Sequence, residues 1–327
     1  MTKSPKIPAG RGDKDALLSN IALLYYGEGM TQNEIAKRYR LSRATIVSML
    51  RDCRERGIVE IRVDGQLLAA SSLSRDLAER YGLQDVYIAA DGVEDGPAPR
   101  RDRLAQVARV ASMAILDIVA PGDRIGVAWG ETIAAVAHAM PRNPVPETQV
   151  CQLIGSQEST RVPASEICAI EVANKLGAQC HTLHAPGIVS SADLARALRA
   201  EPTIQSQLAR LSSLDMTIAA VGHVGADTHM VAADIASATE LAQARDQGAA
   251  GIICCRYIDG NGEEIRTPPH DRVITASLED MRAAPKKLLV VCGSDRLAAT
   301  RAAIRGGLVT HLVVDRQLAE ALVGGAG

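Results

Sequence analysis

Polar and basic side chains cluster between residues 31 and 51, at spacings suited to contacts with a phosphate backbone and with base edges. Arg43 can reach a guanine edge or a phosphate, and Thr45 and Ser48 can contact either group. Ser42 precedes a helical pattern, and a helix N-terminus favours phosphate. The candidate contact residues are Thr31, Gln32, Ser42, Arg43, Thr45, Ser48, Met49 and Arg51. They predict binding to double-stranded DNA; the alternative is a structural helical domain whose arginines are only solvated.

Two short helices joined by a tight turn are predicted to carry these residues. Thr31-Gln32-Asn33-Glu34 has the capping-box pattern, which predicts a helix over residues 32–39. A second helix after Ser42 is expected to bury Ile46, Val47, Leu50 and Cys53 and to expose Arg43, Ala44, Thr45, Ser48, Met49 and Asp52. With a helix from about Asp15 and a strand over residues 58–63, the pattern predicts a winged helix-turn-helix at residues 14–63, after a mobile tail at residues 1–13.

Charge and composition favour a DNA-binding head on a larger globular body. Residues 1–62 hold twelve basic and seven acidic side chains, whereas the 327-residue chain has a net charge of −2. A basic head beside an acidic body predicts that the head alone meets a polyanion. The chain contains no Phe and one Trp, so its core must be aliphatic and stacking on single-stranded nucleic acid is not expected.

The cysteines and the hydropathy predict a reduced, cytoplasmic protein. The seven cysteines are odd in number and form no C-x-x-C pair, which is typical of buried thiols. No apolar run is long enough for a membrane span, and no secretory signal is evident. Cys180, His181 and His184 could suggest a metal site, but strand residues three positions apart, such as His181 and His184, point to opposite faces, so we expect no metal there. We also expect no cofactor.

Strands and helices alternate over residues 64–327, which predicts a mostly parallel α/β domain. Strands are expected near residues 85–90, 124–128, 149–154, 179–183, 216–221, 251–256, 288–292 and 311–314. Helices are expected near residues 102–119, 132–140, 164–176, 193–211, 238–246 and 297–304. Four strands are followed by glycine-containing loops, and ligands bind outside the carboxyl ends of parallel strands. The candidates in those loops are Gly130, Glu131, Thr132, Gly155, Ser156, Gln157, His223, Gly293, Ser294 and Arg296, although a glycine after a strand is more often only a turn.

The N-terminal sequence resembles the head of the SorC family of sugar-responsive transcription regulators, which are also grouped with DeoR-type regulators. Four segments carry the resemblance: the LLYY helix, TQNEIA, the SRATIVSML helix and the ending GIV. Met49 stands where the family often has Arg, so the resemblance implies DNA binding with a different operator sequence.

Residues 64–327 resemble the SorC effector-binding domain, in the segments GDRIGVAWGETIAAVA, CQLIGS, HAPG, DMTIAAVGHVG, CCRYIDGNGEEI and CGSDRLAATRAAIRGGLVTHLVVD. The resemblance implies a fold like ribose-5-phosphate isomerase and glucosamine-6-phosphate deaminase, a bound sugar, and assembly into homodimers or homotetramers. It implies that Gly130, Thr132, Gly155 and Ser156 hold the ligand and that Asp259 accepts hydrogen bonds from sugar hydroxyls. Arg296 stands where phosphate-binding relatives place Lys, so a sugar phosphate and an unphosphorylated sugar or polyol both remain open.

Two other functions compete with a non-enzymatic, ligand-controlled regulator of transcription. A sugar-phosphate isomerase or deaminase with a DNA-binding head would need an acid and a base, for which Glu131, Glu158, His223 and Asp259 are the candidates. A DNA-binding scaffold with an empty body is the third alternative.

Overall fold

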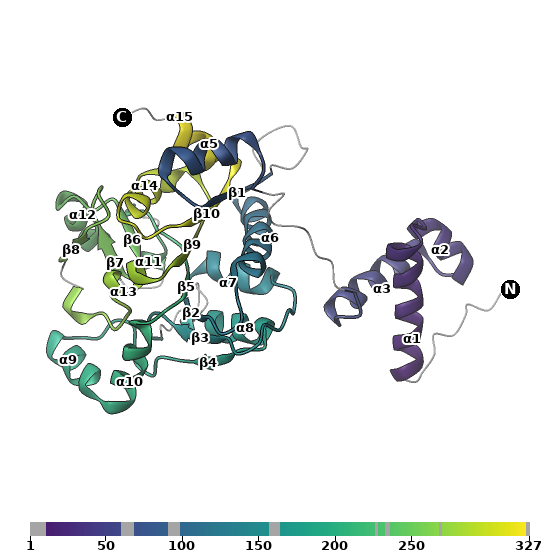
Figure 1. The fold of residues 1–327 in the computed structure, drawn as a ribbon, viewed down its shortest axis with the longest axis horizontal. Helices are drawn as coiled ribbons and strands as arrows, with labels where there is room; N and C mark the ends of the chain where they lie inside the picture. The colour runs from purple at the N-terminus through teal and green to yellow at the C-terminus, as the bar shows by residue number, and fades with distance from the viewer. Residues whose placement is uncertain are drawn as a thin grey trace. The chain divides into compact units, whose positions relative to one another are not determined.

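The computed structural model describes residues 11–59, 69–90, 99–156, 164–225, 228–232, 236–267 and 270–324. The chain separates into two compact units, Met1–Val63 and Asp64–Gly327, which are called the head and the body below (Figure 1). Among the described residues, no helix is long and apolar enough to cross a membrane.

The head is a helical unit around one small core. It contains α1 (Arg11–Ala22), the π-helix η1 (Leu23–Gly27), α2 (Gln32–Tyr39) and α3 (Arg43–Glu55). The predicted capping box is confirmed, because Thr31 accepts from the backbone N–H of Glu34 while the Glu34 carboxylate accepts from that of Thr31. Arg40 ends α2 in the left-handed conformation with φ 55° and so makes the tight turn into α3.

Two predictions at the margins of the head change. Helix α1 begins at Arg11, inside the expected tail, and residues 1–10 lie outside the described part. The predicted strand at residues 58–63 also falls largely outside it. Its first two residues, Ile58 and Val59, instead donate to the carbonyl of Cys53 and close the end of α3.

The body is built on a seven-stranded parallel sheet in the order β1-β10-β9-β5-β2-β3-β4. Its strands are β1 (Asp85–Ala89), β2 (Arg124–Val127), β3 (Gln149–Gln152), β4 (Gln179–His181), β5 (Met216–Ala219), β9 (Lys286–Val291) and β10 (His311–Asp315). A smaller antiparallel sheet holds β6 (Gly251–Ile253), β7 (Arg256–Ile258) and β8 (Glu264–Ile265). The mostly parallel α/β body predicted from the alternating pattern is therefore confirmed.

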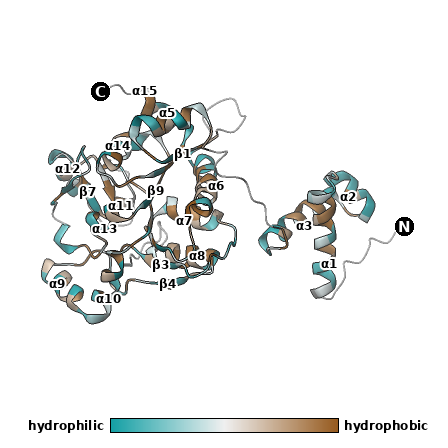
Figure 2. Ribbon diagram, in the orientation of Figure 1, coloured by the Kyte–Doolittle hydropathy of each residue, from teal (hydrophilic) through white to brown (hydrophobic). Residues whose placement is uncertain are grey.

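Helices flank the parallel sheet and bury its aliphatic side chains (Figure 1). The helices of the body are α5 (Ser72–Tyr81), α6 (Arg100–Ile118), α7 (Glu131–Ala139), α8 (Ser165–Leu176), α9 (Ala192–Ala200), α10 (Pro202–Leu211), α11 (His229–Ala232), α12 (Ala238–Asp246), α13 (Leu278–Ala283), α14 (Leu297–Arg305) and α15 (Arg316–Gly324). Of these, α11 and α12 pack on the smaller antiparallel sheet. Two 3-10 helices, η2 (His270–Arg272) and η3 (Ser294–Arg296), complete the body. Much of α6 and α8 is hydrophobic, brown in Figure 2, because one side of each helix is buried.

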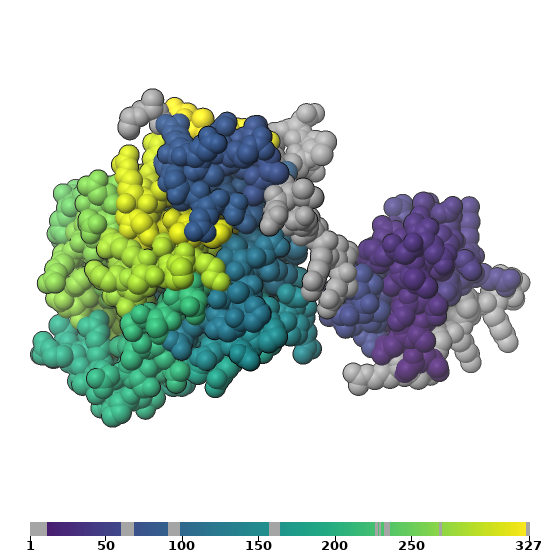
Figure 3. Space-filling view, in the orientation of Figure 1, coloured from purple at the N-terminus to yellow at the C-terminus, as the bar shows by residue number. Residues whose placement is uncertain are grey.

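The first and last helices of the body lie side by side. Figure 3 shows α5, in dark blue, against the yellow C-terminal segment, and the Tyr81 hydroxyl donates to the Leu322 carbonyl over 2.9 Å. The body is thus closed by contacts between its two ends, which the sequence pattern did not indicate.

Two predicted elements are each divided in the structure. The helix expected over residues 193–211 is two helices, because Pro202 has no N–H to continue α9 and instead begins α10. The strand expected over residues 251–256 is a hairpin. Cys254 and Cys255 form its turn with φ 47° and 61°, so the two thiols are buried in a turn and not in a strand.

Candidate functional site: the polar stripe of α3 and the carboxyl edge of the sheet

Helix α3 presents a polar stripe to solvent and an apolar stripe to the head core. Ile46, Met49, Leu50 and Cys53 are buried, at the spacing of one helix face. Met49 is only 6 % exposed, so the prediction that it lies among the outward contact residues is wrong. Val47, expected to be buried, is 45 % exposed. At about 100° per residue, the two residues lie 200° apart around the helix axis and so on opposite sides of α3. Only one of them can face the core, and the prediction chose the wrong one.

The first turn of α3 is held by side chains that could also meet a phosphate. Ser42 caps the helix by accepting from the backbone N–H of Thr45 over 3.0 Å, and the two hydroxyls lie 2.8 Å apart. Arg43 donates from Nε to Oε1 of Gln32 on α2 over 3.3 Å. This hydrogen bond links the first residues of the two helices and limits where the exposed guanidinium can point.

Two arginines near the end of α3 are not equivalent. Arg51 is exposed; its Nη2 donates to the Ser48 hydroxyl over 3.5 Å and its Nε lies 3.8 Å from Glu55. Arg56, just past the helix, instead forms an ion pair with Asp15 of α1. Arg51 therefore keeps an exposed charge on the outward stripe, whereas Arg56 ties α3 to α1.

The strand order brings the four glycine-containing loops of the body together. Strands β9, β5, β2 and β3 are neighbours and all run parallel, so the loops that follow them leave the same edge of the sheet. From β2 the chain proceeds outward to β3 and β4, whereas from β5 it proceeds the other way to β9 and β10. Such a reversal of direction between adjacent strands is where ligands bind in open α/β sheets.

Two of these loops meet through His223 and Asp295. His223 follows β5 and its Nδ1 accepts from the backbone N–H of Gly225 over 3.0 Å. In the neutral ring the proton therefore lies on Nε2, which is 3.5 Å from the Asp295 carboxylate in the loop after β9. Arg296 donates from Nη1 to the same carboxylate and to the Cys292 carbonyl, over 2.6 and 3.1 Å.

Arg100 joins this edge from a distant part of the sequence. It begins α6 and its Nη1 donates to Glu131, after β2, over 2.7 Å. Burial lowers the pKa of the Arg100 guanidinium, but hydrogen bonding to Glu131 and the nearby Asp295 outweigh it and raise that pKa overall. Arg100 was not among the predicted site residues, because it lies 31 positions before its partner and in no glycine loop.

The carboxyl edge thus carries alternating hydrogen-bond donors and acceptors. Arg100 and Arg296 are donors, Glu131 and Asp295 are acceptors, and the two carboxylates keep about half of their surface exposed. Carboxylates accept from sugar hydroxyls, and guanidinium groups donate to hydroxyls or bind phosphate in a bidentate manner. Burial raises the pKa of the neighbouring Cys292 thiol to about 11, so this thiol stays protonated.

The glycines at this edge are required by the chain itself. A Cβ on Gly155 would lie 2.4 Å from the Ala185 carbonyl oxygen, so this residue must be glycine for two backbone segments to meet. Gly130 and Gly293 have φ of 107° and 109°, which favour glycine. The Gly293 N–H donates to Asp315 over 2.5 Å. Ser156 is partly buried and Ser294 is exposed, whereas Gln157 and Glu158 lie outside the described residues.

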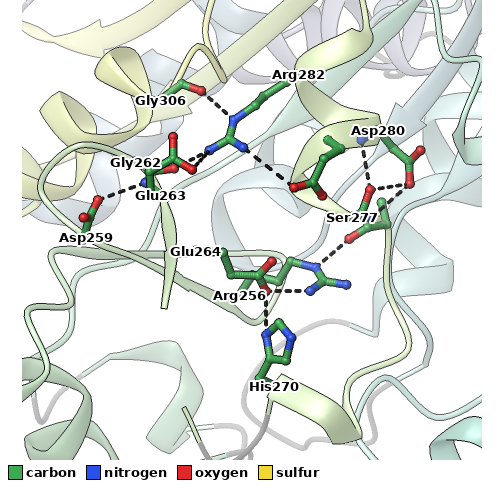
Figure 4. A network of polar contacts seen from close by, with 12 residues as sticks. Arg256, Asp259, Gly262, Glu263, Glu264, His270, Ser277, Asp280, Arg282 and Gly306 are labelled. Atoms are coloured by element: carbon green, nitrogen blue, oxygen red, sulfur yellow. Dashed lines mark hydrogen bonds and ion pairs between the residues drawn. The ribbon is translucent and has the colours of Figure 1, made fainter. Parts of the chain in front are cut away.

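Asp259 is not brought to this edge. It lies in the turn between β7 and β8, where its Oδ1 accepts from the backbone N–H groups of Asn261 and Glu263. Figure 4 shows Asp259 beside Glu263. That turn packs on the C-terminal end of α14, since a Cβ on Gly262 would be 2.4 Å from Ala302 and Gly306. The glycine loop after β9 precedes the opposite end of α14, so the structure places Asp259 apart from the four loops, and its contact with the ligand stays a prediction.

A separate polar cavity of ≈ 340 Å³ lies between α9, α10 and the β6–β7 hairpin. Arg199 and Arg256 line it, but their guanidinium groups donate to the carbonyls of Val273 and Ala276. Arg256 also donates to Glu264 over 2.6 Å, and Glu264 lies 2.9 Å from His270 (Figure 4). These contacts hold residues 273–276, where the Ile274 carbonyl accepts from the Gly155 N–H, and they indicate a structural network.

Metal-ligating residues do not gather within the described ranges. No group of three or more His, Cys, Asp and Glu side chains there could hold a metal ion. His181 ends β4, and His184 follows it with its Nε2 3.4 Å from the Thr182 hydroxyl.

Comparison with known proteins adds to this geometry. Residues 66–324 match the family model described as "Putative sugar-binding domain". The chain is 31 % identical over 301 residues to the "Uncharacterized transcriptional regulator YjhU" of Escherichia coli K12, with 92 % of each chain covered. It is 27 % identical to the "Deoxyribonucleoside regulator" of Bacillus subtilis 168, covering 95 % of this chain and 98 % of that one.

A solved structure shares the fold over nearly the whole chain. The crystal structure of the full-length sorbitol operon regulator SorC from Klebsiella pneumoniae superposes with a TM-score of 0.74 at 22 % identity. The match covers 94 % of this chain and 98 % of that one, so it includes both the head and the body.

Proposed function

This chain belongs to the SorC family of sugar-binding transcriptional regulators. From that premise we propose that its two units bind different partners. The head binds a double-stranded DNA operator through α2 and α3. The body binds a sugar, a polyol or a sugar phosphate at the carboxyl edge of its sheet, and the bound effector changes the affinity for the operator. The observation that carries the proposal is the convergence of four glycine-containing loops beside β2 and β5, in a chain that begins with a helix-turn-helix.

We assign the DNA contacts to the outward side of α3 and to the start of α2. Arg43 contacts a guanine edge, with Gln32 positioning it, and Ser42, Thr45 and Arg51 meet phosphates. Thr31 and Ser48 complete the set, whereas the buried Met49 supports α3 from the core side. A wing after α3 remains part of the proposal, because residues 60–68 lie outside the described part.

We assign effector binding to the four loops that leave the carboxyl edge of the sheet from neighbouring strands. Gly130, Glu131 and Thr132 approach from β2, Gly155 and Ser156 from β3, His223 from β5, and Gly293, Ser294 and Arg296 from β9. Gln157 stays a candidate outside the described residues. Arg100 is added from α6 and Asp295 as a further acceptor for ligand hydroxyls, while the contact of Asp259 with the ligand stays a prediction.

Operators with two half-sites require two heads, so we propose a homodimer or homotetramer that acts in the cytoplasm. The body is proposed to have the ribose-5-phosphate isomerase type of fold without turnover. The competing enzyme function would use His223 and Asp295 as an acid–base pair. Conversion of a sugar phosphate by the purified protein, lost in His223→Gln, would support the enzyme instead.

The DNA-binding assignment is tested with Arg43→Ala and the matched control Arg38→Ala. Both variants remove one exposed arginine from the head, but only Arg43 lies on α3 and contacts Gln32. An operator is first selected from a random duplex library, and fluorescence anisotropy then measures its affinity. Arg43→Ala should lose most sequence-specific binding, because a bidentate guanine contact contributes about 1–3 kcal/mol, while Arg38→Ala should bind nearly as wild type. Equal affinities for the two variants contradict the assignment.

The effector site is tested with a thermal-shift panel in which each sugar and polyol is paired with its phosphate. A ligand at 100 times its Kd adds about 2.7 kcal/mol of stability, which a melting curve resolves. Stabilisation by phosphorylated members alone assigns Arg296 to phosphate. Stabilisation by the free compounds alone assigns the edge to hydroxyl recognition. In either case the shift should disappear in Arg296→Ala; a shift that persists there moves the site elsewhere.

A further inference from the structure

One exposed apolar side chain stands on the polar stripe of α3. Val47 lies four residues after Arg43 and four before Arg51, so the three share one side of the helix. It is 45 % exposed, while Ile46, Met49 and Leu50 are buried in the head core. Val47 therefore adds little to that core and offers its methyl groups on the side that carries the proposed DNA contacts.

The major groove offers few apolar groups to such a side chain. Base edges there present hydrogen-bond donors and acceptors, and the C5-methyl group of thymine is the exception. A β-branched valine has one strongly preferred rotamer in a helix, so its methyl groups are held in place before binding. Ordering it on DNA therefore costs less side-chain entropy than ordering a longer residue.

We propose that Val47 is a specificity-determining residue that contacts the methyl group of a thymine in each half-site. This inference rests on the proposed DNA-binding function of the head. Four residues along a helix span about 6 Å, and successive bases are about 3.4 Å apart. The thymine therefore lies one or two base pairs from the guanine contacted by Arg43, whose guanidinium is positioned by Gln32.

The test removes the methyl group from each partner in turn. An operator is selected from a random duplex library with the full-length wild-type protein, and each thymine is then replaced by deoxyuridine, which lacks only the C5-methyl group. At one position, equivalent by symmetry in the two half-sites, replacing thymine by deoxyuridine should lower the wild-type affinity about fourfold. This corresponds to about 0.8 kcal/mol, the free energy of burying a methyl-sized group. Val47→Ala should bind the thymine and deoxyuridine operators equally well at that position.

Leu23→Ala is the matched control, because Leu23 is 59 % exposed on η1 and lies outside α3. It should discriminate thymine from deoxyuridine as wild type does. Two outcomes overturn the inference if sequence-specific binding itself is retained. In the first, Val47→Ala still binds the thymine operator more tightly than the deoxyuridine operator. In the second, deoxyuridine does not weaken wild-type binding at any thymine within two base pairs of the guanine. Failure to select any operator instead overturns the DNA-binding function on which the inference rests. Circular dichroism of both variants confirms that the head is folded.

Discussion

Gly155 was predicted to contact a ligand because it follows a strand at the carboxyl edge. The structure gives its lack of a side chain a different cause. Its N–H donates to the Ile274 carbonyl, and the place of a Cβ is taken by the backbone of Ala185 to Gly187. A glycine after a strand can thus reflect a close approach of two chain segments, which local sequence cannot distinguish from a ligand-binding loop.

Replacing Gly155 should therefore destabilise the body with or without ligand. Gly155→Ala places a methyl group 2.4 Å from a carbonyl oxygen, and overpacking of this kind costs about 1–3 kcal/mol. Differential scanning calorimetry should show a lower Tm for the body. Gly260→Ala is the control, because Gly260 has open space around it and no positive φ. Equal Tm values for the two variants would show that the segment near Ala185 yields without cost.

The charged residues of the site divide into those that sequence could and could not indicate. His223, Glu131 and Arg296 lie in glycine loops after strands and were predicted. Arg100 lies at the start of a helix far from those loops in the sequence, and only the packing of α6 against α7, β10 and β9 brings it to Glu131, the first residue of α7. Asp259 shows the opposite case, since a resemblance gave it a role, whereas in the structure one of its carboxylate oxygens accepts from N–H groups of its own turn.

At the scale of elements, most helices and strands follow from local pattern, whereas the phase of a short amphipathic helix does not. The α2 boundaries were predicted to the residue from the capping box. For α3, Val47 and Met49 are both apolar and two positions apart, so either could be assigned to the core. The contacts of α1 and α2 decide the phase, and these are tertiary.

The phase of α3 predicts unequal effects of truncating its two apolar residues. Met49→Ala removes a buried side chain and should cost about 2–5 kcal/mol, which is comparable to the whole stability of a small domain. Val47→Ala should change stability by less than about 0.5 kcal/mol, as is usual for an exposed position. Hydrogen exchange of the head amides, followed by mass spectrometry, should show lost protection only for Met49→Ala. The reverse order would mean that α3 is rotated.

At the scale of the whole molecule, the order of the sheet could not be predicted from the sequence. The alternation of strands and helices indicated a parallel sheet, but it did not show that β5 returns to the free side of β2. That return makes β9, β5, β2 and β3 neighbours, and so it assembles loops from four distant parts of the chain. The long-range pairing of buried aliphatic strands fixes this order, and no single local signal specifies it.

The proposed function predicts that effector binding and operator binding are coupled, and this coupling can be measured through the affinity for either ligand. An effector that changes operator affinity by a given factor must have its own affinity changed by the operator by the same factor, since both follow from one free energy of coupling. Anisotropy of the selected operator with and without the effector found in the thermal-shift panel gives the first factor, expected between about 5 and 150. Calorimetric titration of that effector with and without operator gives the second. Arg43→Ala should keep the effector affinity of the free protein, but operator should no longer change that affinity.

A factor of one in both measurements would mean that the effector binds to the body without changing the operator affinity of the head. That outcome contradicts a ligand-controlled regulator even if both sites are occupied.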